Sequence, residues 1–211
     1  MYFKNRSDAA ATLLPRLEKF RGLKVILLAV PEGAVPVAWQ LAKNLDFPVD
    51  LLMVKKLGHP LNKEFEIGAV CQDEIYTEHP AGISETYIAR ESERIKEQLQ
   101  ERYNKLMNNK DPLPVKDKIV LVIDEGIASG KTLMAGIKML RKKSPSKIIV
   151  AVPVSSAEAA EKISTVADEF ICVFKPEQFE SIAQFYDELP LVEDGEILAL
   201  LEELNKRTLT A

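Results

Sequence analysis

One stretch of the sequence decides how the rest is interpreted: residues 119–132, which read IVLVIDEGIASGKT. Five consecutive apolar residues are typical of a strand covered on both faces, and Thr132 opens the expected helix after a turn of small residues. Small residues let backbone N–H groups approach an anion, and a helix N-terminus adds partial positive charge. Asp124 and Glu125 would repel that anion. We therefore expect them to face a sugar, contacting its hydroxyls directly or through Mg²⁺.

Two simpler interpretations of this stretch are disfavoured. An acid that only caps the helix needs no second acid beside it, whereas residues 124–125 supply two. A Walker A loop has four residues between its glycines, whereas three residues separate Gly126 from Gly130. Glu125 stands where that loop places its first glycine, and its charge would oppose a triphosphate. The stretch is better suited to a phosphorylated sugar.

Apolar runs and helical patterns alternate along the chain. The predicted strands are residues 24–30, 49–54, 118–124, 147–153 and 168–174, with helices at 35–45, 132–142 and 157–164. This order is typical of an α/β fold, an open and mainly parallel twisted sheet with helices on both faces. We predict a single domain over residues 1–211, with its core at about 20–175 and a small hood or C-terminal tail at about 176–211.

Further elements are expected outside this alternation. They are a helix at 7–20 capped by Ser7 or Asp8, a polar loop at 55–66, an antiparallel pair at 67–71 and 74–77, a long helix from Ser84 to about Leu106, and a last helix from about Glu193.

Composition and charge restrict the partners of the protein. The 211 residues are 46% hydrophobic, which is ample for a core, and the net charge of −4 does not favour nucleic acid. Apolar runs such as residues 25–30 are too short to cross a membrane, and the first residues lack the pattern of a signal peptide. Cys71 and Cys172 match no metal-binding spacing. We expect a cytoplasmic protein without nucleic-acid or membrane partners.

Three loops are expected at the carboxyl ends of the parallel strands, where open α/β sheets bind ligands. They are residues 31–34, a tight turn reading PEGA, residues 55–58 with two adjacent lysines, and residues 124–131 with the acids and the small-residue turn. Their contents are complementary, because one loop suits a sugar phosphate and another supplies positive charge.

Residues 120–132 resemble the phosphoribosyl-pyrophosphate (PRPP) motif of the type I phosphoribosyltransferases. That motif consists of four hydrophobic residues, two acids, two hydrophobic or small residues, and then Thr or Ser, Gly, any residue and Thr. The resemblance implies the parallel-sheet fold already expected, a variable hood, and Mg²⁺ as cofactor. It also implies a homodimer.

The resemblance assigns roles to residues of all three loops. Asp124 and Glu125 would hold the ribose 2′- and 3′-hydroxyls, and through them or through water they would hold Mg²⁺ indirectly. The 5′-phosphate would be bound by Gly126, Ile127, Ala128, Ser129, Gly130, Lys131 and Thr132. Glu32, Gly33 and Ala34 would form the pyrophosphate loop. Lys55 and Lys56 would begin a mobile loop and meet pyrophosphate oxygens as catalytic residues.

A longer resemblance, to a bacterial subgroup of the family, covers roughly residues 24–204 and rests on four segments. They are VPVA at 35–38, VKKLGHP at 54–60, IGAV at 67–70, and the tail from PEQF at 176–179 to FY at 185–186. The subgroup usually has Pro-Arg-Gly-Gly in its first loop, whereas this chain has Glu32 and Ala34 there. Two like charges about 4 Å apart repel by about 1 kcal/mol in water. Either Glu32 points away, or Mg²⁺ bridges it, or turnover is weak.

The predicted activity is transfer of the phosphoribosyl group of PRPP to a nitrogenous base with release of pyrophosphate, which makes the protein a pentosyltransferase. The alternative is a regulatory protein of the same fold that binds PRPP or a nucleotide with little or no turnover. Ala128 replaces the Asp that serves as acid–base residue in the 6-oxopurine enzymes, so hypoxanthine and guanine are not the expected bases. His59 is either a proton donor or pyrophosphate ligand, or an ordinary loop residue. Phe179, Phe185 and Tyr186 either stack on a base or pack the tail onto the sheet.

Overall fold

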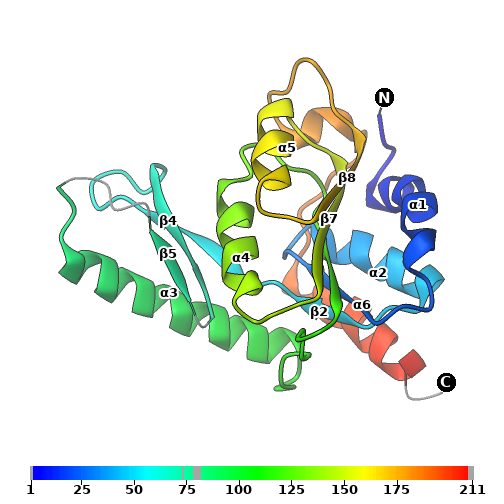
Figure 1. The fold of residues 1–211 in the computed structure, drawn as a ribbon, viewed down its shortest axis with the longest axis horizontal. Helices are drawn as coiled ribbons and strands as arrows, with labels where there is room; N and C mark the ends of the chain where they lie inside the picture. Colours follow the sequence, from blue (N-terminus) through cyan, green and yellow to red (C-terminus); the bar gives the residue numbers. More distant parts are fainter. Residues whose placement is uncertain (1, 73, 78–81, 209–211) are drawn as a thin grey trace.

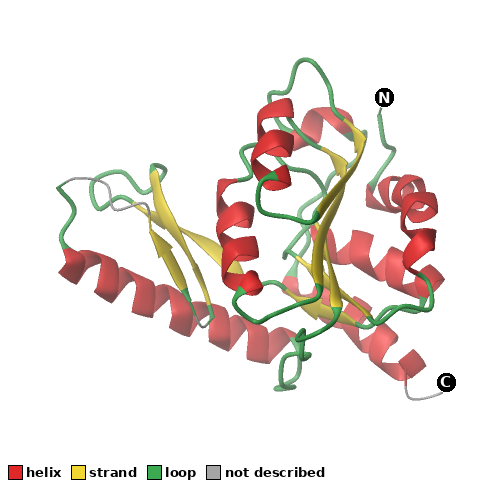
Figure 2. Cartoon of the chain, in the orientation of Figure 1, coloured by secondary structure: helices red, strands yellow, loops and turns green. Residues whose placement is uncertain are grey.

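A parallel five-stranded sheet forms the centre of the molecule, which a computed structural model describes over residues 2–72, 74–77 and 82–208 (Figures 1 and 2). In spatial order its strands are β2 (Val49–Leu51), β1 (Val25–Ala29), β6 (Ile119–Ile123), β7 (Lys147–Val154) and β8 (Glu169–Phe174). β1 and β6 pair in register from Val25 opposite Ile119 to Ala29 opposite Ile123. The loops that follow these two strands therefore begin side by side.

Helices cover both faces of this sheet, as the sequence predicts. On one face lie α1 (Arg6–Leu17), the short η1 (Glu18–Phe20) and α2 (Ala34–Leu45), and the other face carries α4 (Lys131–Arg141) and α5 (Ala157–Ser164). Strand residues alternate between the two cores: Leu27 and Ala29 join the α1–α2 side, whereas Ile26 and Leu28 join the α4–α5 side. Burial on both faces explains the continuous apolar runs in the sequence.

A second layer of structure, which we call the arm, projects from the sheet on the left of Figure 1. It consists of β3 (Val54–Gly58), β4 (Glu66–Cys71), β5 (Ile75–Thr77) and α3 (Glu85–Leu106). The three strands form a separate antiparallel sheet in the order β3-β4-β5. The Ser84 side chain accepts a hydrogen bond from the Tyr87 N–H, which caps α3 as predicted.

The structure corrects the sequence-based elements at three places. The predicted strand at 49–54 is two elements, because β2 ends at Leu51 and Val54 begins β3 in the other sheet. The predicted loop at 55–66 is wrong for residues 55–58, which pair with β4. Lys55 is exposed and Lys56 is partly exposed on this strand, so the strand lacks the apolar run that marks a buried strand. The cap of α1 is Asn5, whose side chain accepts the Asp8 N–H, and not Ser7 or Asp8.

The tail folds back over the first residues of the chain. After β8 come η2 (Ile182–Phe185) and α6 (Asp194–Thr208). The Phe3 N–H donates to the Phe185 carbonyl (2.8 Å), and the Asp187 N–H donates to the Phe3 carbonyl (2.9 Å). The aromatic rings of Phe3 and Tyr186 lie 5.3 Å apart, and Phe179 packs against Phe185 at the same distance. The tail aromatics therefore pack with one another and with the N-terminal segment.

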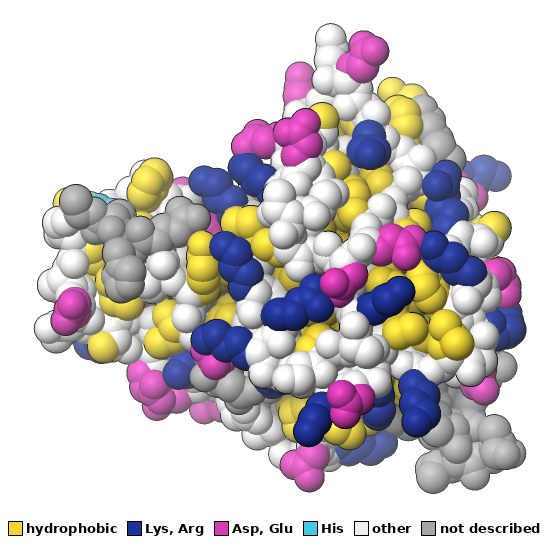
Figure 3. Space-filling model, viewed as in Figure 1, with side chains coloured by type: hydrophobic (Ala, Val, Ile, Leu, Met, Phe, Trp, Pro, Cys, Tyr) yellow, Lys and Arg dark blue, Asp and Glu magenta, His cyan; other side chains and the backbone are white. Residues whose placement is uncertain are grey.

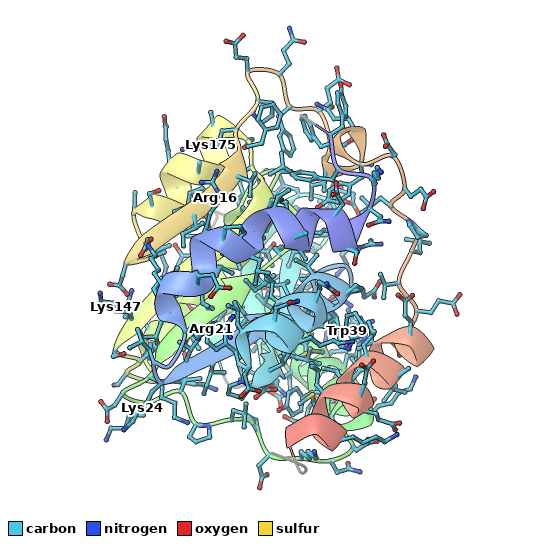
Figure 4. The ribbon with its side chains drawn as sticks, turned by 90° about the vertical axis from the view of Figure 1, so that its right-hand side faces the viewer. Arg16, Arg21, Lys24, Trp39, Lys147 and Lys175 are labelled. Carbon is cyan, nitrogen blue, oxygen red and sulfur yellow. The ribbon has the colours of Figure 1, made fainter. Side chains whose placement is uncertain are left out.

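The surface is mixed in charge. Figure 3 shows Lys and Arg side chains interspersed with Asp and Glu on the face toward the viewer. Figure 4 looks onto α1 and α2, with Trp39 beside α6; the Lys43 ammonium lies 4.1 Å from the Trp39 ring centre and pairs with Glu203 of α6. Of the helices that the structure describes, none combines the length and apolarity that a membrane span requires.

Candidate active site

The candidate site lies where β1 and β6 end. Residues 30–33 connect β1 to α2, so loop 31–34 ends on the first residue of α2, and turn 124–130 connects β6 to α4. The Val30 N–H donates to the Ile123 carbonyl (3.1 Å), so the pairing of the two strands continues to the first residue beyond β1. The sequence-predicted pyrophosphate loop and the PRPP turn are therefore brought together.

Glu125 joins these two loops. A Cβ atom added at Gly33 would lie 2.0 Å from Oε2 of Glu125, so the carboxylate rests directly on the backbone of loop 31–34. Position 33 must be glycine for this approach. Arg6 Nε donates to Glu125 Oε2 at 2.7 Å, and the two side chains are only 11% and 20% exposed. The half-buried carboxylate is thus paired with a cation, which offsets the cost of partly removing its charge from water.

Asp124 experiences a different environment from its neighbour. Burial raises the pKa of the Asp124 carboxyl to about 8, and the Glu125 charge raises it further, whereas a hydrogen bond from the Glu125 N–H acts in the opposite direction. That N–H donates to Asp124 Oδ1 at 2.8 Å. A ligand that brings hydroxyl groups or a cation to this carboxyl would favour its ionised form.

The turn after the acids is held against β7 and left open at its tip. The Ile127 N–H donates to the Val154 carbonyl (3.0 Å), and Ser156 Oγ donates to the Ala128 carbonyl (2.6 Å). Gly130 has a φ of +69° and immediately precedes α4. Ala128 and Ser129 are exposed. The first N–H groups of a helix have no partner within it, so the start of α4 presents donors suited to a phosphate.

The side chain of Glu32 is directed to the arm. Its Oε1 lies 2.7 Å from Arg102 Nη2 on α3, and Arg102 also pairs with Asp194 at the start of α6 (2.8 Å). Lys105 pairs with Asp194 as well, at 2.9 Å. Of the three possibilities raised by the sequence (Glu32 points away, Mg²⁺ bridges it, or turnover is weak), the contact bears only on the direction of the side chain, which is toward α3.

Comparison with known proteins shows the family of the chain. The sequence model of the family described as "Phosphoribosyl transferase domain" matches residues 6–188. The chain belongs to this family. The family resemblance that the PRPP motif carries in the sequence is confirmed.

Individual relatives agree with the family assignment. Two Mycobacterium tuberculosis proteins, each named "Putative phosphoribosyl transferase", are 31% identical over 210 residues, which is 97% of this chain and 47% of each relative. The chain thus spans about half the length of these relatives. The crystal structure of TT1426 from Thermus thermophilus superposes with a TM-score of 0.84 at 30% identity, covering 97% of this chain and 99% of that one. A Staphylococcus aureus hypoxanthine phosphoribosyltransferase shares the fold, with a TM-score of 0.50 at 14% identity over 84% of this chain and 78% of its own.

Two lysines that we expected at the site form their contacts within the arm. Lys55 Nζ donates to Gln98 Oε1 of α3 at 3.4 Å, and Lys56 pairs with Glu64 at 2.6 Å. Both lie on β3, whereas we predicted that they begin a mobile loop. Their catalytic role stays a prediction. His59 follows β3, and its Nδ1 accepts the Leu61 N–H (3.1 Å) as an ordinary loop residue does.

Thr132 and Lys131 lie at the start of α4, facing the arm. Thr132 Oγ1 donates to Glu66 Oε1 at 3.1 Å, and Lys131 lines a small hollow with Glu66, Gly68 and Tyr76. A phosphate at the turn would compete with Glu66 for the Thr132 hydroxyl.

Two arginines that touch the loops of the site, Arg6 and Arg102, were not singled out from the sequence, and the contact of Tyr186 with Glu125 was not predicted. The Tyr186 hydroxyl donates to the Glu125 carbonyl at 2.7 Å, and burial raises its pKa, so it stays a donor. These residues lie far from their partners in the sequence, and a lone Arg in a polar helix carries no local signal. Only the fold brings Arg6 and Tyr186 to Glu125 and Arg102 to Glu32.

Asp124 and Glu125 are suited to hold Mg²⁺ indirectly, through water or substrate hydroxyls. Among the described residues, no group of three or more His, Cys, Asp or Glu side chains is arranged to hold a metal ion. Mg²⁺ is commonly bound through one or two carboxylates together with waters and substrate phosphates. Asp124 and Glu125 supply the two carboxylates, so the donor set agrees with contact through water or substrate hydroxyls.

Proposed function

We propose that this chain binds PRPP and Mg²⁺ and transfers the phosphoribosyl group to a nitrogenous base. The observation that supports the proposal best is the position of Glu125, whose carboxylate rests on Gly33 of one loop while its own turn leads into the open N-terminus of α4. A ligand with a sugar between a phosphate and a pyrophosphate would span these two loops.

Each part of the site has a proposed role. Asp124 and Glu125 hold the ribose hydroxyls, residues 126–132 bind the 5′-phosphate, and the backbone of residues 32–34 faces the pyrophosphate. Lys55 and Lys56 reach pyrophosphate oxygens only after leaving their partners in the arm. Mg²⁺, contacted through hydroxyls or water by the two acids, supplies positive charge to the leaving pyrophosphate.

The reaction breaks the bond between ribose carbon 1 and the pyrophosphate oxygen and forms a bond from that carbon to a nitrogen of the base. Positioning and charge neutralisation supply the rate enhancement, since the chain offers no assigned general base. Ala128 has no acid–base group, so we do not propose hypoxanthine or guanine as the acceptor. We further propose a cytoplasmic homodimer.

The test measures PRPP binding and pyrophosphate release. We expect calorimetry to detect Mg²⁺-dependent PRPP binding, and a panel of purine and pyrimidine bases to reveal release with at least one of them. The double variant Asp124→Asn with Glu125→Gln should abolish binding, whereas the exposed pair Glu177→Gln with Glu180→Gln should bind like wild type. Affinity of the acid variant within about threefold of wild type, or roughly 0.65 kcal/mol, would refute the assigned role of the acids.

The second candidate is a regulatory protein that binds PRPP without turnover. Glu32 favours it, because an acid in loop 31–34 opposes the departing pyrophosphate unless Arg102 neutralises it. PRPP binding without pyrophosphate release for every base of the panel would support this candidate over the enzyme.

A further inference from the structure

A junction of four charged side chains connects loop 31–34 to the arm and to the tail. Arg102 and Lys105 come from α3, Asp194 from the start of α6, and Glu32 from the loop. Arg102 is the centre of this junction because it pairs with both carboxylates. Positive charge from the arm is thus placed at the loop that follows β1.

The two carboxylates paired with Arg102 use only one of its guanidinium nitrogens. Both ion pairs use the same nitrogen, Nη2, at 2.7 Å to Glu32 and 2.8 Å to Asp194. A guanidinium carries five N–H donors in a planar fork that matches phosphate oxygens. Within the described part of the chain, neither of these two carboxylates engages Nε or Nη1 of Arg102. The side chain is 34% exposed, so an anion can reach it.

The junction lies next to the sugar side of the site. Arg102 contacts residue 32, and Glu125 rests on residue 33. Adjacent residues of one loop therefore carry the guanidinium contact and the carboxylate contact. A ligand whose ribose lies at Glu125 would direct a pyrophosphate along this loop, within the neighbourhood of Arg102.

We propose that Arg102 binds the pyrophosphate moiety of the substrate and that Glu32 competes with the substrate for it. This inference rests on the function proposed above. The Glu32–Arg102 pair is solvent-accessible, with side chains 44% and 34% exposed, and such pairs are weak. A multiply charged oxyanion replaces the single Glu32 carboxylate, while Asp194 keeps the guanidinium in place. Glu32 therefore holds Arg102 until substrate displaces it.

The test is binding of inorganic pyrophosphate, measured by calorimetry in the presence of Mg²⁺, to four forms of the full chain. Arg102→Gln should weaken binding about tenfold or more, the loss expected for charge-assisted hydrogen bonds. Glu32→Gln should tighten binding about threefold, because it removes the competitor. Lys105→Gln removes a positive charge from the same junction without touching Glu32, and should change the affinity by less than about twofold.

The opposite signs of two effects distinguish this proposal from a structural role. A merely structural ion pair predicts that Arg102→Gln and Glu32→Gln shift binding in the same direction or not at all, and either result overturns the inference. Arg102→Lys keeps the charge but loses the fork. It should give intermediate affinity, and it replaces Arg102→Gln if that variant does not fold. If wild type binds PRPP through the acids but Arg102→Gln binds pyrophosphate normally, the proposed function stands and this inference falls.

Discussion

Both sides of the candidate site follow strands of the parallel sheet, but the ion pairs around them differ in exposure. The turn at 124–130 belongs to the parallel sheet, whose interior strands are buried on both faces, and its Arg6–Glu125 pair is 11% and 20% exposed. Loop 31–34 borders the arm, where ion pairs such as Lys56–Glu64 are 42% and 85% exposed. Buried pairs fix geometry, whereas exposed pairs exchange readily with solvent and ions. The ribose side is therefore preset, and the pyrophosphate side is adjustable.

The largest expected effect is on stability and concerns the Arg6–Glu125 pair. Arg6→Gln leaves the Glu125 charge unpaired in a half-dry site and should lower the free energy of unfolding by about 2–3 kcal/mol. Denaturant titration of the single variants and of Arg6→Gln with Glu125→Gln measures the coupling energy. A coupling below about 0.5 kcal/mol would show that this side is no more rigid than the arm.

A smaller effect is expected from adding one methyl group to the loop. In Gly33→Ala the new Cβ would meet the Glu125 carboxylate at 2.0 Å, so the carboxylate must move. PRPP affinity should fall about tenfold, since misplacement by about 1 Å is costly in such sites. Gly195→Ala, where a Cβ meets nothing within 4 Å, is the matched control. Equal affinity of both variants would contradict the assigned contact.

Protonation of Asp124 tests the preset side through stability. Its pKa of about 8 lies above the ordinary value of 3.8, so the folded state binds more protons than the unfolded state between those values. Stability is then highest at the acidic end of this window and falls as pH rises toward 8. The difference in melting temperature, Asp124→Asn minus wild type, should increase by at least about 3 °C from about pH 5 to about pH 8. A constant difference across that range would mean that the folded chain does not raise this pKa.

The smallest effect is expected in the arm. Lys56→Gln with Glu64→Gln, analysed as a double-mutant cycle, should give a coupling below about 0.5 kcal/mol that declines further in salt. The measurement is urea unfolding at low and high ionic strength. A coupling as large as that of the Arg6–Glu125 pair would remove the contrast between the two sides.

The sequence predicted the strands of the parallel sheet well and β3 poorly, for a physical reason. The strands of the parallel sheet are buried on both faces, so they appear as apolar runs such as residues 119–123, and the acids follow directly. β3 belongs to the arm and carries the partly or fully exposed Lys55 and Lys56, so its sequence resembles that of a polar loop. Arg6 and Arg102 reach the site across 119 and 70 residues of chain, and no local pattern encodes such a distance.

The pairing of residues 3–6 with the tail has a consequence for the order in which the site is completed during synthesis. Phe3 and Lys4 receive their backbone partners from residues 185–188, and Arg6 also donates to the Pro190 carbonyl. Residues 3–6 leave the ribosome long before these partners do, and must wait for them before they can dock. A nascent chain would complete the last strand of the sheet at Phe174 and would hold residues 3–6 in place only once residues 185–190 had followed.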